Sequence, residues 1–404
     1  MSSLIYILSG TGHRVRKVLF GSLRTALPYL FSMLWPLIVI WLFGKSYWGD
    51  CVDALLIVNV ITLIVGWGTG KHLLKKFDLL PANINDAWLE NLHNRFAILA
   101  CFILLVIFSP FSLLMKIGIL MLIIGKYFYV TYEPVIEYKH RYGIAIGAEM
   151  IGFISGFSML YIINKEIANE HIIFSMGVGE LVRNVLLIIL MKDVKIQMRF
   201  RFFRPGFYIQ AYPFFMLSFA SIFIHMVDRV FVYTNFNNEI KAEYQIYMNF
   251  LLFLISFPNF LLMPFFKNYY KSKIQLSSGN HILLIVLGAL ITPFFLWLVW
   301  LLCKHFYQFD VSWNFLITGM LFVFPSFIYY PFTLRLISRN KQLGLSFVMF
   351  ILSVLLVFLC YYMIDVYGLS GALYAATIGQ WGLLVMILIL NMQEQSERKI
   401  KFIK

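Results

Sequence analysis

Long apolar runs, each bounded by short polar or charged stretches, recur along the whole chain. A helix that crosses the hydrocarbon core of a bilayer needs about 20 mostly apolar residues. The runs have this length and predict about twelve transmembrane helices. The expected spans are 25–43, 52–69, 96–114, 117–137, 142–163, 171–190, 208–228, 242–265, 281–302, 314–334, 343–363 and 370–391.

Composition indicates the same class of protein. Hydrophobic residues make up 61% of the 404 residues, and charged residues 13%, which is about half of the share in a soluble domain. Such a chain cannot cover itself with polar surface in water, so we expect an all-α integral membrane protein. The formal net charge of +14 does not indicate nucleic-acid binding, because no solvated domain is left to carry a basic surface.

The basic residues are unevenly distributed between the two sets of connecting segments. An even number of spans puts both termini on one side, and the segments on that side contain most of the 33 Lys and Arg residues. The connections on the other side are short and contain few basic residues. Lys and Arg accumulate in cytoplasmic loops, so this pattern predicts that both termini are cytoplasmic.

The domain organisation follows from the same pattern. We expect two lobes of six helices each, at 25–191 and 208–391. A basic cytoplasmic linker at 192–207, with a Pro-Gly pair near its end, would join them. An interfacial cytoplasmic segment is expected at 1–24, and a basic cytoplasmic tail at 392–404.

Ionisable and polar residues lie inside five consecutive spans, where charges are expensive and indicate a function or a buried pair. In the fourth span, Lys126, Tyr129, Glu133 and Glu137 are spaced so that they share one face of a helix. Taken together, the polar stripes favour a polar route through the bundle. The other members are Glu149 in the fifth span, Glu180, Arg183 and Asn184 in the sixth, His225, Asp228 and Arg229 in the seventh, and Asn249 in the eighth.

Each of these groups also has a purely structural interpretation. Glu180 can neutralise Arg183, and Lys126 can neutralise Glu149, since buried partners are the usual fate of such charges. The remaining structural alternatives are a solvated rim for Glu133 and Glu137, ordinary packing for Tyr129, and an interfacial ion pair between Asp228 and Arg229.

Motifs for catalysis and for cofactor binding are absent from the sequence. It contains no GxxxxGK[ST] loop for ATP, no HExxH, and no His, Cys or Asp cluster with metal-ligand spacing. The four cysteines show no CxxC spacing and are expected to be small apolar side chains in the core. We therefore expect no cofactor, no metal and no enzymatic activity.

Two regions resemble a known family of transporters. Phe43–Asp50 resembles the family's glycine-bearing turn between helices one and two, although the usual Arg before that turn is missing. Further along, Asp228 near a helix end, Tyr244 opening the next helix and Pro264 near that helix's end resemble the family's seventh and eighth helices. With its twelve spans and two lobes, the chain resembles the polysaccharide-flippase branch of the multidrug/oligosaccharidyl-lipid/polysaccharide exporter superfamily, which includes the O-antigen flippases.

The resemblance implies a transporter of the bacterial inner membrane. It would flip an undecaprenyl-pyrophosphate-linked oligosaccharide to the periplasmic leaflet by alternating access, for assembly of O-antigen or capsule. It implies coupling to H⁺ or Na⁺ or to the membrane potential, and it allows a polysaccharide polymerase as partner. On this interpretation Lys126 and Arg183 attract the pyrophosphate. The other expected roles are ion coupling or structural pairing for Glu149, Glu180, Asp228 and Arg229, and polar lining of the cavity for Tyr129, His225, Asn184 and Asn249.

Three other functions fit a polytopic chain. A small-molecule or multidrug antiporter of the same superfamily needs only a smaller pocket. A glycan polymerase or membrane glycosyltransferase would be an enzyme, but polymerases generally carry a long periplasmic loop with Arg residues, and the outer loops here are short. A flippase for the peptidoglycan precursor belongs to a family with fourteen spans.

Overall fold

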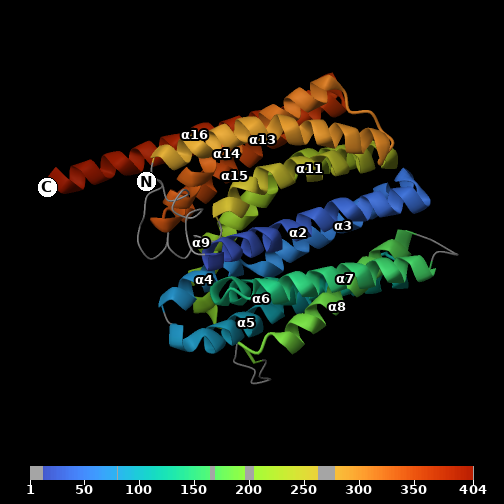
Figure 1. Cartoon of the computed structure of the whole chain (residues 1–404), viewed down its shortest axis with the longest axis horizontal. Coiled ribbons are helices and arrows are strands. Elements are labelled where there is room, and N and C mark those ends of the chain that lie inside the picture. Colours follow the sequence, from blue (N-terminus) through green and yellow to red (C-terminus); the bar gives the residue numbers. More distant parts are fainter. Residues whose placement is uncertain (1–11, 80, 164–168, 196–203, 263–277, 404) are drawn as a thin grey trace. The chain divides into compact units, whose positions relative to one another are not determined.

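The computed structural model describes residues 12–403, except for 80, 164–168, 196–203 and 263–277. The described residues form helices joined by short turns, with no strand among them (Figure 1). The helices of the first half are α2 (Gly12–Phe43), α3 (Lys45–Gly66), α4 (Thr69–Leu79), η1 (Pro81–Asn83), α5 (Ile84–Ile107), α6 (Leu113–Lys139), α7 (Tyr142–Ile163) and α8 (Asn169–Leu190). Those of the second half are α9 (Pro205–Ile224), α10 (Val227–Asn235), α11 (Asn238–Leu262), α13 (Ser278–His305), α14 (Trp313–Ser338), α15 (Gln342–Tyr367) and α16 (Leu369–Ile403).

The predicted class and the number of spans are confirmed. Twelve helical stretches in the described part are long and apolar enough to cross a membrane, and each overlaps one of the twelve expected spans. The chain is therefore an all-α, multi-pass membrane protein. The cytoplasmic side of both termini stays a prediction.

The largest difference from the expected spans lies between the second and third. Residues 70–95 were expected to form an inner connection with a short surface helix. The structure has α4 there, but α5 begins at Ile84, twelve residues before the expected span at 96–114. Asn91, Asn94 and Arg95 look like loop residues in the sequence, yet they are buried inside the bundle. Asn91 and Arg95 bind groups on other helices, and Asn94 binds the backbone just before α9, so the apolar count alone missed the first half of α5.

Two other boundaries also moved. α2 runs without interruption from Gly12, so part of the segment expected to lie on the membrane surface continues directly into the first span. The expected seventh span, 208–228, is divided, because α9 ends at Ile224 and the short α10 starts at Val227. The end of the expected eighth span and Pro264 lie outside the described residues.

Turn residues explain how the helices connect. Gly44 has φ 99°, a left-handed value that glycine adopts without a steric penalty, and it separates α2 from α3. The Ser112 hydroxyl accepts a hydrogen bond from the Met115 N–H and caps α6. Trp67 and Gly68 both have positive φ and break the second span into α3 and α4. A Cβ on Gly68 would lie 2.4 Å from the Phe215 nitrogen, so this break also allows the N-terminal part of α9 to come close.

The chain forms two compact units. The first is Leu19–Ser218, with six spans and most of α9, and the second consists mainly of Phe219–Lys404. The linker expected at 192–207 is described at its ends. The backbone N–H of Lys195 donates to Asn85 Oδ1 at 2.9 Å, and that of Arg204 donates to Asn94 Oδ1 at 2.8 Å. Both ends are thus bound to α5 within the first unit, while residues 196–203 lie outside the described part.

Within the first unit, glycines bring three helices into close contact. A Cβ on Gly152 of α7 would lie 2.7 Å from the Gly179 carbonyl oxygen of α8. On the other side of α8, a Cβ on Gly177 would lie 2.9 Å from the Gly118 carbonyl oxygen of α6. This small-residue packing is typical of membrane helices. It places α6, α7 and α8 side by side, as Figure 1 shows.

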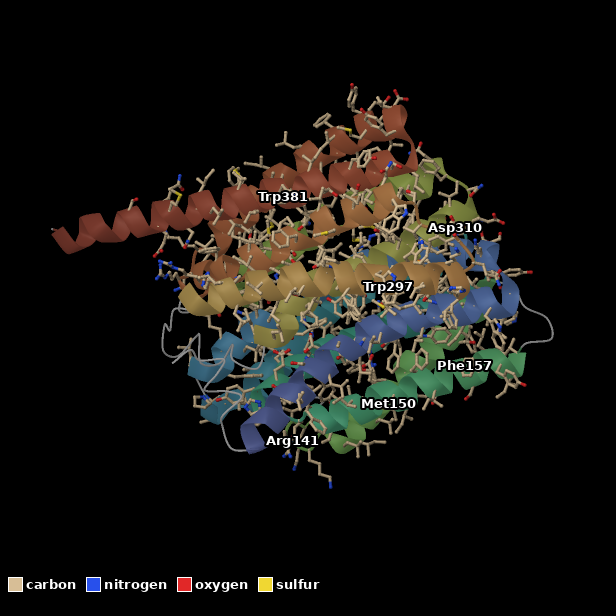
Figure 2. The ribbon with its side chains drawn as sticks, turned by 45° about the horizontal axis from the view of Figure 1, so that its top comes forward. Arg141, Met150, Phe157, Trp297, Asp310 and Trp381 are labelled. Carbon is tan, nitrogen blue, oxygen red and sulfur yellow. The ribbon has the colours of Figure 1, made fainter. Side chains whose placement is uncertain are left out.

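The outer surface agrees with a lipid environment. Met150 on α7, Trp297 on α13 and Trp381 on α16 point outward (Figure 2), and they are 47%, 53% and 38% exposed. Arg141 lies just before the start of α7, and its guanidinium donates to both carboxylate oxygens of Asp193. These hydrogen bonds and the carboxylate charge raise the pKa of Arg141 above its usual value. This ion pair thus lies near the helix ends, and exposed apolar side chains lie along the helices themselves.

Candidate functional site: a charged cluster in the first unit

The first unit contains a group of interacting ionisable side chains inside its spans. We call this group the charged cluster. Its members are Arg24 on α2, Lys126, Tyr129, Glu133 and Glu137 on α6, Glu149 on α7, and Glu180 and Arg183 on α8.

The α6 stripe predicted from the sequence gives the cluster its direction. Lys126 and Glu137 are eleven residues apart, which corresponds to about 17 Å along a helix. Glu137 lies near the C-terminal end of α6, and Lys126 lies near the middle of this helix. The cluster therefore extends from one end of the span to about its centre.

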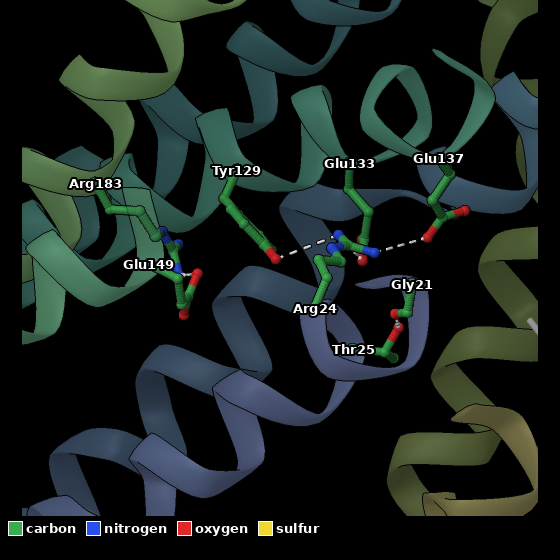
Figure 3. Close-up of polar contacts among 8 residues, drawn as sticks. All are labelled: Gly21, Arg24, Thr25, Tyr129, Glu133, Glu137, Glu149 and Arg183. Carbon is green, nitrogen blue, oxygen red and sulfur yellow. Dashed lines mark hydrogen bonds and ion pairs between the residues drawn. The ribbon is translucent and has the colours of Figure 1, made fainter. Parts of the chain in front are cut away.

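Arg24 forms one half of the cluster (Figure 3). Its side chain is 3% exposed, and its two terminal nitrogens donate to Glu137 Oε1 at 3.0 Å and Glu133 Oε1 at 2.8 Å. The interpretation as a solvated rim is wrong for Glu137, whose side chain is 11% exposed and binds a buried arginine, whereas Glu133 is 33% exposed and stays partly solvated while it binds the same arginine. Lys71 interacts electrostatically with Glu137 as well.

Arg183 forms the other half. Its Nη1 donates to both carboxylate oxygens of Glu149, at 3.0 and 3.1 Å, and its Nη2 donates to Glu180. The pairing of Glu180 with Arg183 within α8 is thus confirmed. The expected pairing of Glu149 with Lys126 is wrong, because Arg183 binds Glu149 instead. The Arg183 Nε atom is buried and has no hydrogen-bond partner.

Tyr129 lies between the two arginines. The Arg183 guanidinium carbon is 3.9 Å from the centroid of the Tyr129 ring, a cation–π contact. The Tyr129 hydroxyl accepts a hydrogen bond from Arg24 Nη2 at 3.2 Å. One aromatic side chain therefore contacts both halves of the cluster, which goes beyond the ordinary packing expected for it.

Lys126 interacts with the cluster differently. Its Nζ donates to Asn59 Oδ1 on α3 at 2.8 Å, and no carboxylate in the described part forms an ion pair with it. It still interacts electrostatically with Glu180 and Arg183. Lys126 is therefore the cation of the cluster whose ammonium is bound by a neutral group.

The charges of the cluster balance once Lys71, which interacts electrostatically with Glu137, is included. Arg24 with Lys71 faces two carboxylates, and Arg183 with Lys126 faces the other two. Neutrality is what a low-dielectric environment favours, because an uncompensated charge is expensive there. The structure thus shows both arginines paired with carboxylates, whereas the sequence predicted cations that attract an anion directly.

The other predicted residue of the first unit is Asn184. Its Nδ2 donates to the Glu180 backbone carbonyl at 2.6 Å, and its buried Oδ1 has no hydrogen-bond partner. A Cβ on Gly125 of α6 would lie 3.3 Å from Asn184 Nδ2. Asn184 therefore packs tightly against α6, close to the cluster.

The remaining predicted residues form separate groups in the second unit. Asp228 is 2% exposed and accepts a hydrogen bond from the Tyr244 hydroxyl at 2.6 Å. Arg229 donates to the His225 backbone carbonyl, at 3.2 Å from Nε and 3.0 Å from Nη2. The expected ion pair between Asp228 and Arg229 is absent from the described contacts. Asn249 lies half-buried on α11.

His225 belongs to a buried chain of polar side chains that the sequence analysis missed. The His225 Nδ1 is 3.3 Å from Gln380 Nε2, and Gln380 Oε1 accepts from the Tyr329 hydroxyl at 3.1 Å. The partners come from α14 and α16, far from His225 in the sequence. No residue spacing in the sequence predicts such a contact.

Two buried arginines were also missed as site residues, because both looked like cytoplasmic loop charges. Arg24 completes the cluster. The sequence feature that indicates a missing cation is the pair of acids in the fourth span, Glu133 and Glu137, which have no basic partner assigned. Arg95 is 0% exposed and donates to Asn91 Oδ1 at 2.8 Å, to the Val65 carbonyl at 3.2 Å and to Thr131. Val65 lies just before the break at the end of α3, so Arg95 satisfies a carbonyl that the helix leaves free.

Comparison with known proteins shows that solved membrane transporters have a similar fold. No protein-family model and no curated protein sequence matches the chain. An outward-facing multidrug resistance MATE transporter of the MOP superfamily aligns over 97% of this chain and 98% of its own, with a TM-score of 0.65 and 11% identity. A MATE transporter of Vibrio cholerae aligns over 95% and 97%, with a TM-score of 0.60 and 11% identity. The lipid II flippase MurJ, in an inward closed conformation, aligns over 92% and 87%, with a TM-score of 0.60 and 14% identity. At these identities the similarity shows a shared fold, and this chain has the fold of those transporters.

Proposed function

We propose that the protein is an alternating-access transporter that flips a lipid-linked oligosaccharide across the bacterial inner membrane, with the glycan carried on undecaprenyl pyrophosphate. The product would serve the assembly of a surface polysaccharide such as O-antigen or capsule. The observation that supports the proposal is the charged cluster, which extends from the end of α6 to about its middle inside the spans of the first unit. The fold shared with a lipid II flippase agrees with a lipid-linked substrate.

The physical argument starts from the head group. A pyrophosphate with sugars cannot enter hydrocarbon without polar partners, because unpaired charges there are expensive. Arg183 and Lys126 supply guanidinium and ammonium donors in mid-span, and Arg24 supplies a guanidinium nearer the helix end. A guanidinium fork matches a phosphate in two parallel hydrogen bonds. Arg183 is therefore the proposed pyrophosphate ligand, and Lys126 the second cation beside it.

The neutral balance of the cluster favours a second candidate, a small-molecule antiporter. Glu149 and Glu180 are acids in mid-span that a cationic compound can pair with when it displaces Arg183. The MATE transporters among the structural neighbours, which include a multidrug resistance transporter, have the same fold. In that case the carboxylates would bind the substrate, and Arg183 would hold them in its absence.

Deletion of the gene followed by analysis of the lipid-linked intermediates distinguishes the candidates. The flippase proposal predicts that the surface glycan is lost and that complete repeat units accumulate on the cytoplasmic leaflet. Single units that reach the periplasmic leaflet without being joined would indicate a polymerase instead. An unchanged glycan together with increased drug sensitivity would indicate the antiporter.

Complementation of the deletion strain tests the residues. Arg183→Ala and Lys126→Ala should lower the surface glycan while the amount of protein in the membrane stays normal. Glu239→Gln, at an exposed position in the first turn of α11, is the matched control and should complement fully. Normal complementation by both cluster variants at normal protein levels would remove their proposed roles.

A further inference from the structure

We infer that Glu149 and Glu180 form a proton-binding site that fills when an anionic head group occupies Arg183. The inference rests on the proposed function, in which a pyrophosphate reaches the charged cluster. It adds that substrate and protons bind together, and that the two carboxylates around one guanidinium are the groups that take up the protons.

The first step concerns the donors of Arg183. Both terminal nitrogens already donate to carboxylates, Nη1 to Glu149 and Nη2 to Glu180. Either edge of the guanidinium that could bind a phosphate includes at least one of these nitrogens. The buried Nε–H without a partner can complete only the edge that it shares with Nη2. A phosphate therefore binds beside a carboxylate at Arg183 whichever edge it uses, and it competes with that carboxylate for the guanidinium.

The second step concerns the charges that surround the competing carboxylate. α6 supplies Lys126 and Tyr129, α7 supplies Glu149, and α8 supplies Glu180. From α3, the neutral Asn59 binds Lys126. Arg24 of α2 donates a hydrogen bond to the Tyr129 hydroxyl and is paired with two other carboxylates, Glu133 and Glu137.

The charge count then decides the outcome. The two cations near Arg183, namely Arg183 and Lys126, equal the two carboxylates before the substrate binds. A pyrophosphate diester adds two negative charges and leaves an excess of two in a region where the carboxylate side chains are 10% and 19% exposed. Negative charges on neighbouring groups favour the protonated form of a carboxylate. One proton from the solvent on each carboxylate restores neutrality.

Protonation also restores the hydrogen bonds. An ionised carboxylate only accepts, whereas a protonated carboxyl group has one O–H donor. Glu149 and Glu180 can then donate to the phosphate oxygens from the positions in which they had accepted from Arg183. The same two side chains therefore change from partners of the guanidinium to partners of the anion.

The test measures protons directly on the full-length protein in nanodiscs. The probe is citronellyl-pyrophosphoryl-N-acetylglucosamine, a pyrophosphate diester that lacks the second ionisation of a phosphate monoester near pH 6. Isothermal titration at one pH in two buffers of different ionisation enthalpy gives the number of protons bound with the probe. We expect uptake of one to two protons. For each proton, the affinity should then increase about tenfold per unit decrease in pH, by linkage.

Variants assign the protons to residues. In the Glu149→Gln and Glu180→Gln double variant the side chains keep an acceptor and a donor but cannot titrate. We expect no proton uptake, an affinity independent of pH, and binding near neutral pH that is tighter than for the unmodified protein. Glu239→Gln should leave both the uptake and the affinity unchanged.

Each result has a distinct meaning. Probe binding without proton uptake, or with proton release, would overturn the inference and leave the proposed function standing. Uptake that persists in the double variant would also overturn it, since other groups would carry the protons. Failure of the probe to bind at any pH would remove the proposed function and the inference with it. If the double variant does not fold, the two-buffer measurement on the unmodified protein still decides whether protons are bound.

Discussion

Replacement of Arg24 by Gln removes the cation that binds both Glu133 and Glu137 and leaves these two carboxylates close together. The structure predicts that this single change destabilises the protein. It also predicts that replacement of both acids by Gln in the same chain restores most of the lost stability, because the triple variant contains neither the cation nor the anions.

The magnitude follows from the burial of the three side chains. Removing one partner of a buried ion pair costs about 3–5 kcal/mol, because an uncompensated charge stays behind. Arg24 and Glu137 are 3% and 11% exposed, but Glu133 is 33% exposed, so solvent screens part of its charge. We therefore expect the lower end, about 3 kcal/mol, which corresponds to about a hundredfold change in the unfolding equilibrium. The triple variant should differ from the unmodified protein by about 1 kcal/mol or less, since neutral replacements of a whole buried pair are often tolerated.

Unfolding by sodium dodecyl sulfate in mixed micelles, followed by tryptophan fluorescence, measures these differences. Glu239→Gln provides the control for loss of a carboxylate outside the cluster. A triple variant as unstable as Arg24→Gln alone would refute the reasoning, since the loss would then come from packing or hydrogen bonding of Arg24 and not from its charge. An unchanged stability of the single variant would show that the ion pairs do not hold α2 to α6.

Three further predictions concern packing and the link between the two arginines. Gly152→Val should destabilise the protein by about 2 kcal/mol in the same unfolding assay, because its added carbon would meet α8, whereas Gly147→Val, which has open space, should have little effect. Tyr129→Phe should lower the free energy of unfolding by about 1 kcal/mol, because its hydrogen bond with Arg24 is lost. Tyr129→Leu should lower it by about 2 kcal/mol more, because the ring contact with Arg183 is lost as well. Equal effects of the two changes would contradict the contact between the ring and the guanidinium. Gly68→Ala should lower the thermal midpoint, because it combines φ 67° with a clash against the α9 backbone, and a neutral result would mean that this close contact is not present in the membrane.

Local patterns in the sequence were sufficient for the spans and for the faces of single helices. The length of the apolar runs alone predicted twelve spans, and each overlaps a span of the structure, because membrane crossing depends on length and hydrophobicity more than on any partner. The offsets along α6 correctly placed Lys126, Tyr129, Glu133 and Glu137 on one interacting face. The pairing of Glu180 with Arg183 was also accessible, since residues three apart on a helix are neighbours.

Contacts between helices were not accessible in the same way. The partner of Glu149 is Arg183 and not Lys126, because close packing through Gly152 and Gly179 brings α7 against α8 at that level. Two residues 34 positions apart become neighbours through this packing, and no spacing rule in the sequence predicts it. A single sequence therefore gave most of the charged residues of the site, but not Arg24, and only part of their pairing.

Arg24 and Arg95 show why the basic residues near span ends need a second interpretation. Counting them as loop charges supports a topology, because Lys and Arg gather on one side of the membrane. Both are nevertheless buried, Arg24 against carboxylates and Arg95 against neutral oxygens alone. An arginine within a turn or two of an apolar run can extend into the bundle when acids or free carbonyls lie opposite it. The acids at Glu133 and Glu137, unpaired within their own helix, indicate a cation from another helix, but charge balance alone does not select Arg24 among the basic residues near the span ends.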